Sequence, residues 1–204
     1  MRCAVKKLLI AGFVALLPAF AFAQKPLDVR GLGKDWVETE FPSNGQIHME
    51  LQSGGAHIVG SPDNKVRVRC TGKRAEESHH VRVRLEATGR SGELRISGGP
   101  HDNFEFEIQI PQQTDLIIRM PAGELNVEGV TGNKDVRVHA GEVNIQVGDP
   151  AAYDHVKASV WAGEIHGGPF GEGKDGLFRS FHAEGNGKFD LQVRLKAGEV
   201  TFRK

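Results

Sequence analysis

The sequence predicts an all-β fold, a single-stranded β-helix or β-solenoid-like stack of short strands. Apolar and polar residues alternate along most of the chain, and no segment keeps the i, i+3, i+4, i+7 spacing of an amphipathic helix. The chain also holds 26 glycines and only 7% aromatic residues. In addition, the motif Ala-Gly-Glu followed by an aliphatic residue occurs four times. A fixed glycine at a period near 20 residues is typical of stacked β coils. An antiparallel β-sandwich built from hairpins is the alternative, because periodicity alone does not separate the two folds.

Residues 1–23 have the pattern of a secretory signal peptide. Arg2, Lys6 and Lys7 precede an apolar run over 8–21, and Ala21-Phe22-Ala23 forms a small-x-small cleavage site. The run contains Pro18 and is shorter than the roughly 20 apolar residues that a membrane-spanning helix needs. We therefore expect export to the periplasm, cell surface or extracellular medium, a mature chain that begins at Gln24, and no transmembrane segment in it.

The mature chain divides into an N-terminal extension over 24–44 and a β-solenoid domain over 45–204. Period-two alternation predicts half-buried strands around residues 47–51, 66–70, 81–85 and 104–110. Residues 61–64, Ser-Pro-Asp-Asn, predict a type I turn, and residues 111–115 predict another corner. Residues 73–80 are compatible with a helical turn or two.

The four repeats begin at residues 122, 140, 162 and 197, at intervals of 18, 22 and 35 residues. Alanine and glycine are small enough for a tight turn, and glycine supplies a positive φ where the turn needs one. The aliphatic residue that follows then returns to the core. Each unit therefore holds two short strands and two turns, and stacking buries the apolar face that one unit alone leaves exposed. Residues 167–176 are expected to form a loop or widened coil before a final strand pair that ends at Phe202.

Composition and motifs argue against several classes of function. The chain has 26 basic and 26 acidic residues, so loss of the three basic residues of the signal peptide leaves 23 against 26, a net charge of −3. Nucleic-acid-binding domains are usually strongly basic, so no nucleic-acid partner is expected. We find no hydrolase elbow, zinc-protease motif or phosphate-binding loop, hence no catalytic residue, no metal site and no cofactor. Cys70 is the only cysteine of the mature chain and is expected to be a buried, inert thiol.

The repeated acidic position is the candidate binding edge. In a stack, successive strands lie about 4.8 Å apart, and neighbouring carboxylates repel by about 1 kcal/mol in water. A Ca²⁺ ion or a cationic partner would relieve this repulsion. The alternative, which we favour, is that nearby basic residues neutralise the edge, namely Lys134, Arg137, Lys157 and Lys196, or that the corners splay apart. The edge itself consists of Glu124, Glu142, Glu164 and Glu199.

Four aromatic residues, Trp161, Phe170, Phe178 and Phe181, surround the glycine-rich segment. If exposed, they would stack on sugar rings or insert into a partner. If buried, they would cap the end of the coil stack, as solenoids require.

The chain resembles the bacterial putative-adhesin family, a group of exported or envelope β-repeat proteins. The resemblance is carried by residues 104–111, by Leu116 and by 122–129, and extends to 54–60, 66–70 and 163–200, so that it covers roughly 45–204. The usual corner of that family is small-Gly-Asp-aliphatic, and here glutamate takes the acidic position. The resemblance implies a β-helix-like domain without known catalytic residues and a surface or adhesion role.

We expect a non-enzymatic, exported cell-envelope protein that serves as an adhesion or interaction scaffold for an unidentified envelope or surface partner, either protein or polysaccharide. A β-helical carbohydrate-active enzyme is one alternative, and would need two carboxylates about 5–10 Å apart across a groove. A cation-binding structural module is another. Exposed end strands would also allow copies of the chain to pair into a homo-oligomer. The loose candidates for catalytic carboxylates are Asp154, Glu164, Asp175 and Asp190.

Overall fold

The computed structural model describes residues 26–71, 79–98 and 104–204. The predicted signal peptide and most of the predicted helical turn over 73–80 lie outside these residues. No helix within the described ranges is long and apolar enough to cross a membrane.

The described chain is almost entirely β-structure, as predicted. Two short 3₁₀ helices, η2 (Pro150–Ala152) and η3 (Gly168–Phe170), interrupt the later strands. The strands are β1 (Leu27–Arg30), β2 (Val37–Glu40), β3 (Gly45–Glu50), β4 (Gly54–Ser61), β5 (Lys65–Thr71), β6 (Arg82–Thr88), β7 (Ser91–Ser97), β8 (Glu105–Pro111), β9 (Thr114–Glu128), β10 (Lys134–Gln146), β11 (Tyr153–His166), β12 (Lys174–Glu184) and β13 (Phe189–Arg203).

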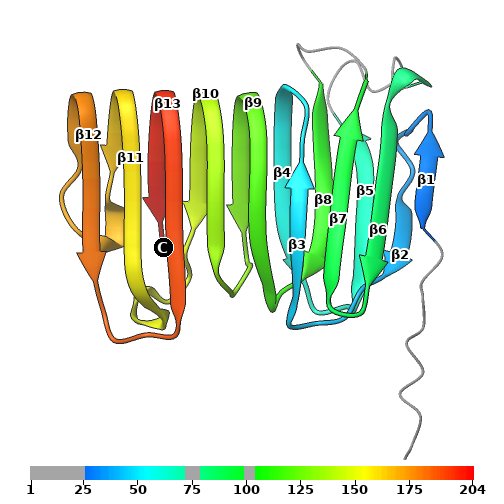
Figure 1. Ribbon diagram of the computed structural model, residues 1–204, viewed down its shortest axis with the longest axis horizontal. Coiled ribbons are helices and arrows are strands. Elements are labelled where there is room, and N and C mark those ends of the chain that lie inside the picture. The colour runs from blue at the N-terminus through cyan, green and yellow to red at the C-terminus, as the bar shows by residue number, and fades with distance from the viewer. Residues whose placement is uncertain (1–25, 72–78, 99–103) are drawn as a thin grey trace, which may run out of the picture.

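The strands stack into a flat slab of two layers (Figure 1). Each of the long strands β9, β10, β11 and β13 runs along one layer, bends at its Ala-Gly corner and returns along the other layer. The pairing of β9 shows this bend. Its first part, Thr114–Arg119, lies beside β3, and its second part, Gly123–Glu128, lies beside β4. The predicted stack of two-armed coils is thus confirmed.

The core lies between the two layers. In β10, Val136 and Val138 are buried before the corner, and Val143 and Ile145 are buried after it. The alternation therefore directs apolar side chains inward on both arms, as a period of two requires. The aliphatic residue that follows each corner is also fully buried, as predicted (Leu125, Val143, Ile165 and Val200).

The stack does not follow the order of the chain. β13 lies in parallel register between β10 and β11, while β12 pairs antiparallel with the outer side of β11. The long interval between the third and fourth corners exists because β12 occupies it. The glycine-rich segment is accordingly not only a loop, since it contains η3 and the first residues of β12.

The N-terminal half carries features of the alternative fold. β6 and β7 form an antiparallel hairpin, and β5 pairs antiparallel with β8. Within the predicted extension over 24–44, β1 and β2 pair with β6 and β5. The slab therefore joins an N-terminal half of mixed parallel and antiparallel pairing to a mainly parallel coil stack. Cys70 lies in β5 and is buried, in agreement with the prediction.

Candidate binding surfaces

The corners determine which residues share a face of the slab. In the register of β9, β10, β13 and β11, the four Ala-Gly-Glu motifs lie directly side by side. Residues that precede a corner belong to one layer, and residues that follow it belong to the other. The repeats therefore build two separate rows of exposed side chains near the same end of the slab, one on each face.

After the corners, the predicted acidic edge forms a continuous ladder. Its order across the stack is Glu124, Glu142, Glu199, Glu164, because β13 lies inside the stack. Asp175 of β12 extends the ladder opposite Glu164. All four predicted residues are thus brought together, and a fifth carboxylate joins them.

A histidine and two neutral polar side chains contact the glutamates of this ladder. His166 Nε2 lies 3.3 Å from a carboxylate oxygen of Glu164 and 3.3 Å from one of Glu199. Asn126 donates to Glu124 at 2.8 Å, and Thr201 donates to Glu199 at 2.8 Å.

The basic residues expected to neutralise the ladder lie elsewhere. Lys134 is buried at the start of β10, and the other three precede a corner, so they belong to the opposite layer. None of them forms an ion pair with a ladder carboxylate in the described ranges. The prediction of neutralisation by Lys134, Arg137, Lys157 and Lys196 was wrong, because the corner switches the face between these residues and the glutamates.

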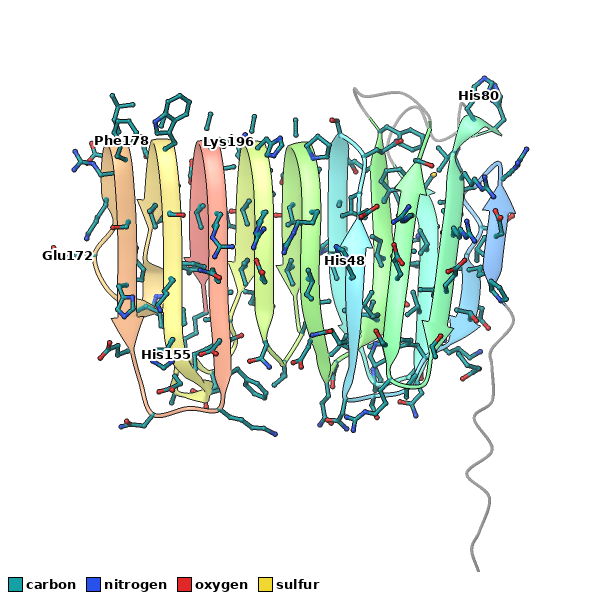
Figure 2. All side chains as sticks on the ribbon, in the orientation of Figure 1. His48, His80, His155, Glu172, Phe178 and Lys196 are labelled. Atoms are coloured by element: carbon teal, nitrogen blue, oxygen red, sulfur yellow. The ribbon has the colours of Figure 1, made fainter. Side chains whose placement is uncertain are left out.

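The ladder carboxylates do not converge on a point. Among the described residues, three potential ligand atoms lie within 4.8 Å of one another only at Asp154, His155 and Asp190. There His155 Nδ1 lies 3.1 Å from an oxygen of each aspartate, at the end of the slab opposite to the corners (Figure 2). These three side chains are largely exposed, and they stand where β11 and β13 begin.

The four loose catalytic candidates are therefore divided into two pairs. Asp154 and Asp190 flank His155, while Glu164 and Asp175 face each other across β11 and β12. A shallow depression of about 290 Å³ borders the second pair.

Before the corners, the opposite face carries a row of cations. Arg119, Arg137 and Arg194 lie in register on β9, β10 and β13, and Ser159 continues the row on β11. One row closer to the corners lie His139, Lys196, Trp161 and Phe178. Figure 2 shows Lys196 and Phe178 together at this end of the slab. The two rows border a groove of about 490 Å³, which we call the corner groove; Arg119 lies beside it.

The corner groove has an excess of positive charge. Asp135 is the acid shared by the row, with oxygens 3.1 Å from Arg119, 3.6 Å from Arg137 and 3.7 Å from Arg194. No acidic side chain of the described part of the chain lines the groove. The Arg194 nitrogen that faces Asp135 at 3.7 Å, Nη1, is buried and forms no hydrogen bond among the described residues.

Exposed aromatic rings form one end of the corner groove. Trp161 is 57% exposed and Phe178 is 74% exposed, with ring centroids 6.0 Å apart. Phe178 has a φ of +54°, which is unusual for a bulky residue. In the described part of the chain, the large apolar side chains that stand exposed are these two and the adjacent Leu177.

The remaining two aromatic residues pack in or against the core. Phe181 is buried, and Phe170 packs edge-to-face against Tyr153 and Phe202 with centroids 5.8 Å away in each case. The four aromatics singled out in the sequence thus divide equally between capping and exposure. The arginine row was missed, although a signal existed: arginine stands three residues before the alanine of three corners, at Arg119, Arg137 and Arg194.

No family model and no curated protein matches this chain. Among solved structures, a protein from Clostridium sporogenes aligns over 88% of this chain and 99% of its own, with a TM-score of 0.50 and 17% identity. It is described as a putative cell adhesion protein. This chain has the same fold. The predicted resemblance to the putative adhesins is therefore confirmed for the fold. A second structure, a putative adhesin from Bacteroides fragilis, aligns over 85% of this chain and 99% of its own, with a TM-score of 0.26 and 9% identity.

Proposed function

We propose that this chain is a non-enzymatic, exported protein of the cell envelope that serves as an adhesion or interaction scaffold. One observation carries the proposal: the corner groove joins exposed Trp161 and Phe178 to several cations, of which Arg137 and Arg194 share the single acid Asp135. Exposed aromatic rings beside arginine are typical of binding surfaces. The interior of the slab, by contrast, is closed by apolar side chains.

The proposed location rests on the N-terminal residues. A basic start, an apolar run and the Ala21-Phe22-Ala23 site favour secretion. The fold shared with a protein described as a putative cell adhesion protein agrees with a place at the periplasm, cell surface or exterior.

The arrangement of carboxylates favours binding over hydrolysis. A glycosidase holds its two acids on opposite sides of one scissile bond, and a site that excludes water strengthens their action. Here Asp154 and Asp190 flank an exposed histidine, and Glu164 and Asp175 belong to an open ladder. Neither pair spans the corner groove.

Co-sedimentation of purified Gln24–Lys204 with envelope and exopolysaccharide fractions tests the proposal. We expect saturable retention that falls when Trp161 is replaced by alanine. Leu177→Ala serves as the matched control, because Leu177 is 63% exposed but does not line the corner groove. Absence of retention in every fraction would contradict the scaffold role. Cleavage of a glycan by the protein would contradict its non-enzymatic part.

A further inference from the structure

The row of arginines has a repeat that a polymer can match. Arg137 and Arg194 lie on adjacent paired strands, and Arg119 precedes them on the next strand. Neighbouring strands are separated by about 4.8 Å. This spacing is close to the length that one pyranose ring adds to an extended polysaccharide. A linear chain lying across the strands would thus present about one sugar to each strand.

The side chains of the corner groove select the chemistry of such a polymer. A guanidinium group offers a planar fork of donors that fits a carboxylate. Three arginines share the single carboxylate of Asp135, so the row keeps an excess of positive charge that carboxylates on a ligand would neutralise. The C–H groups on the apolar face of a sugar ring carry partial positive charge and are attracted to the negative face of an aromatic ring such as Trp161.

We propose that the corner groove binds a linear acidic polysaccharide whose rings bear carboxylates, lying across β10, β13, β11 and β12. Its carboxylates pair with Arg137, Arg194 and Lys196, and a sugar ring stacks on Trp161 beside Phe178. This inference rests on the proposed scaffold function and names its ligand class.

An extended peptide fits less well. Such a peptide binds a sheet mainly through backbone hydrogen bonds at an edge, but the floor of this groove is a sheet face whose backbone groups already pair between strands.

Fluorescence of Trp161 provides the test. The sequence has two tryptophans. The other, Trp36, lies far from the corner groove, where Arg69 Cζ stands 4.3 Å from the centroid of its ring. In a Trp36→Phe background, Trp161 is the sole reporter. The probes are an oligomer of galacturonic acid, a neutral oligomer of galactose and poly-glutamate, each titrated at low and high salt. We expect a saturable change with the acidic sugar, at least about tenfold weaker binding of the neutral one, and weakening by salt.

A matched pair of variants tests the arginine row. Arg137→Gln with Arg194→Gln should weaken binding of the galacturonate oligomer by about tenfold. The control is Arg84→Gln with Arg95→Gln, which removes the same charge from the same layer, where Glu86 and Glu93 already pair with those arginines. We expect no loss in the control, and unchanged thermal unfolding in both.

Three results would overturn the inference: equal binding of the neutral sugar, equal binding of poly-glutamate, or equal losses in the two variant pairs. Absence of any Trp161 response would also overturn it. Retention of the wild type by envelope fractions would then still support the scaffold function, so the two proposals fail separately.

Discussion

A methyl group added to Gly141 would lie 1.9 Å from the carbonyl oxygen of Gly123, its neighbour in the stack. The two corner glycines also share a positive φ, +125° at Gly123 and +131° at Gly141, which side chains rarely adopt. The backbones at the corners are therefore packed too closely for any side chain. This contact repeats at Gly198 and Gly163.

Gly141→Ala should consequently destabilise the fold by more than about 3 kcal/mol, because the clash is with backbone and no side chain can move aside. Urea unfolding of the mature chain measures the change. Gly148→Ala is the control, since Gly148 has a φ of +66° with nothing within 4 Å of the added methyl, and should lose only about 1–2 kcal/mol. Equal losses in the two variants would contradict the close corner packing.

The exposed ring at Phe178 should contribute to binding and not to stability. Phe178→Asn replaces a strained bulky residue by one that tolerates positive φ, so we expect thermal stability to stay equal or rise by under about 1 kcal/mol. Binding of the galacturonate oligomer should nevertheless fall, because the aromatic platform is reduced. Leu177→Asn, outside the corner groove, should retain binding. A stability loss at Phe178 with intact binding would assign this ring a structural role instead.

Lys134 should make stability depend on pH. It is buried, and its Nζ donates to Tyr153 at 2.8 Å and to the carbonyl of Gly132 at 3.1 Å. Burial lowers the pKa of Lys134 to about 8, although the charge of Asp115 raises it in part. Between pH 8 and the usual lysine pKa of 10.5, the unfolded chain binds more protons, so stability rises with pH.

The measurement is urea unfolding at pH 8 and pH 10. We expect the wild type to gain about 2 kcal/mol relative to a Lys134→Met, Tyr153→Phe double variant, which also avoids leaving the buried hydroxyl unpaired. Above pH 10 the gain should stop growing, because burial raises the pKa of Tyr153 to about 12 and its ionisation then favours unfolding. Parallel pH profiles of the two proteins would contradict the buried lysine.

The acidic ladder should be a source of repulsion. Glu142 lies between Glu124 and Glu199. We expect Glu142→Gln to raise stability by under about 1 kcal/mol at low salt and to have no effect at high salt. Glu172→Gln, in the exposed segment beside β12, is the control. If millimolar Ca²⁺ stabilises the wild type and this effect disappears in Glu142→Gln, the ladder is instead a cation site.

The Cys70 thiol should react slowly in the native protein. It is 1% exposed, and burial raises its pKa to about 12, so little thiolate forms at neutral pH. A thiol reagent should modify it only after addition of urea. Fast native modification would show that β5 opens locally.

Much of the fold follows from local pattern. The alternation of Val136, Val138, Val143 and Ile145 determines which side chains are buried, whichever strand lies beside them. The candidate ladder also follows from repetition, since identical corners align when coils stack. The arginine row was equally visible, three residues before the corner alanines, but its significance depends on which face the corner gives it.

The sequence by itself determined the strands, the turns and the corner glycines, because alternation and positive φ are properties of a short segment. Only the tertiary structure decided that β13 lies between β10 and β11, so that Glu199 separates Glu142 from Glu164. It also decided that Trp161 and Phe178 are exposed while Phe181 is buried. Strands select neighbours through backbone hydrogen bonds that are the same for every sequence, so the order of a stack is settled by the packing of the whole chain.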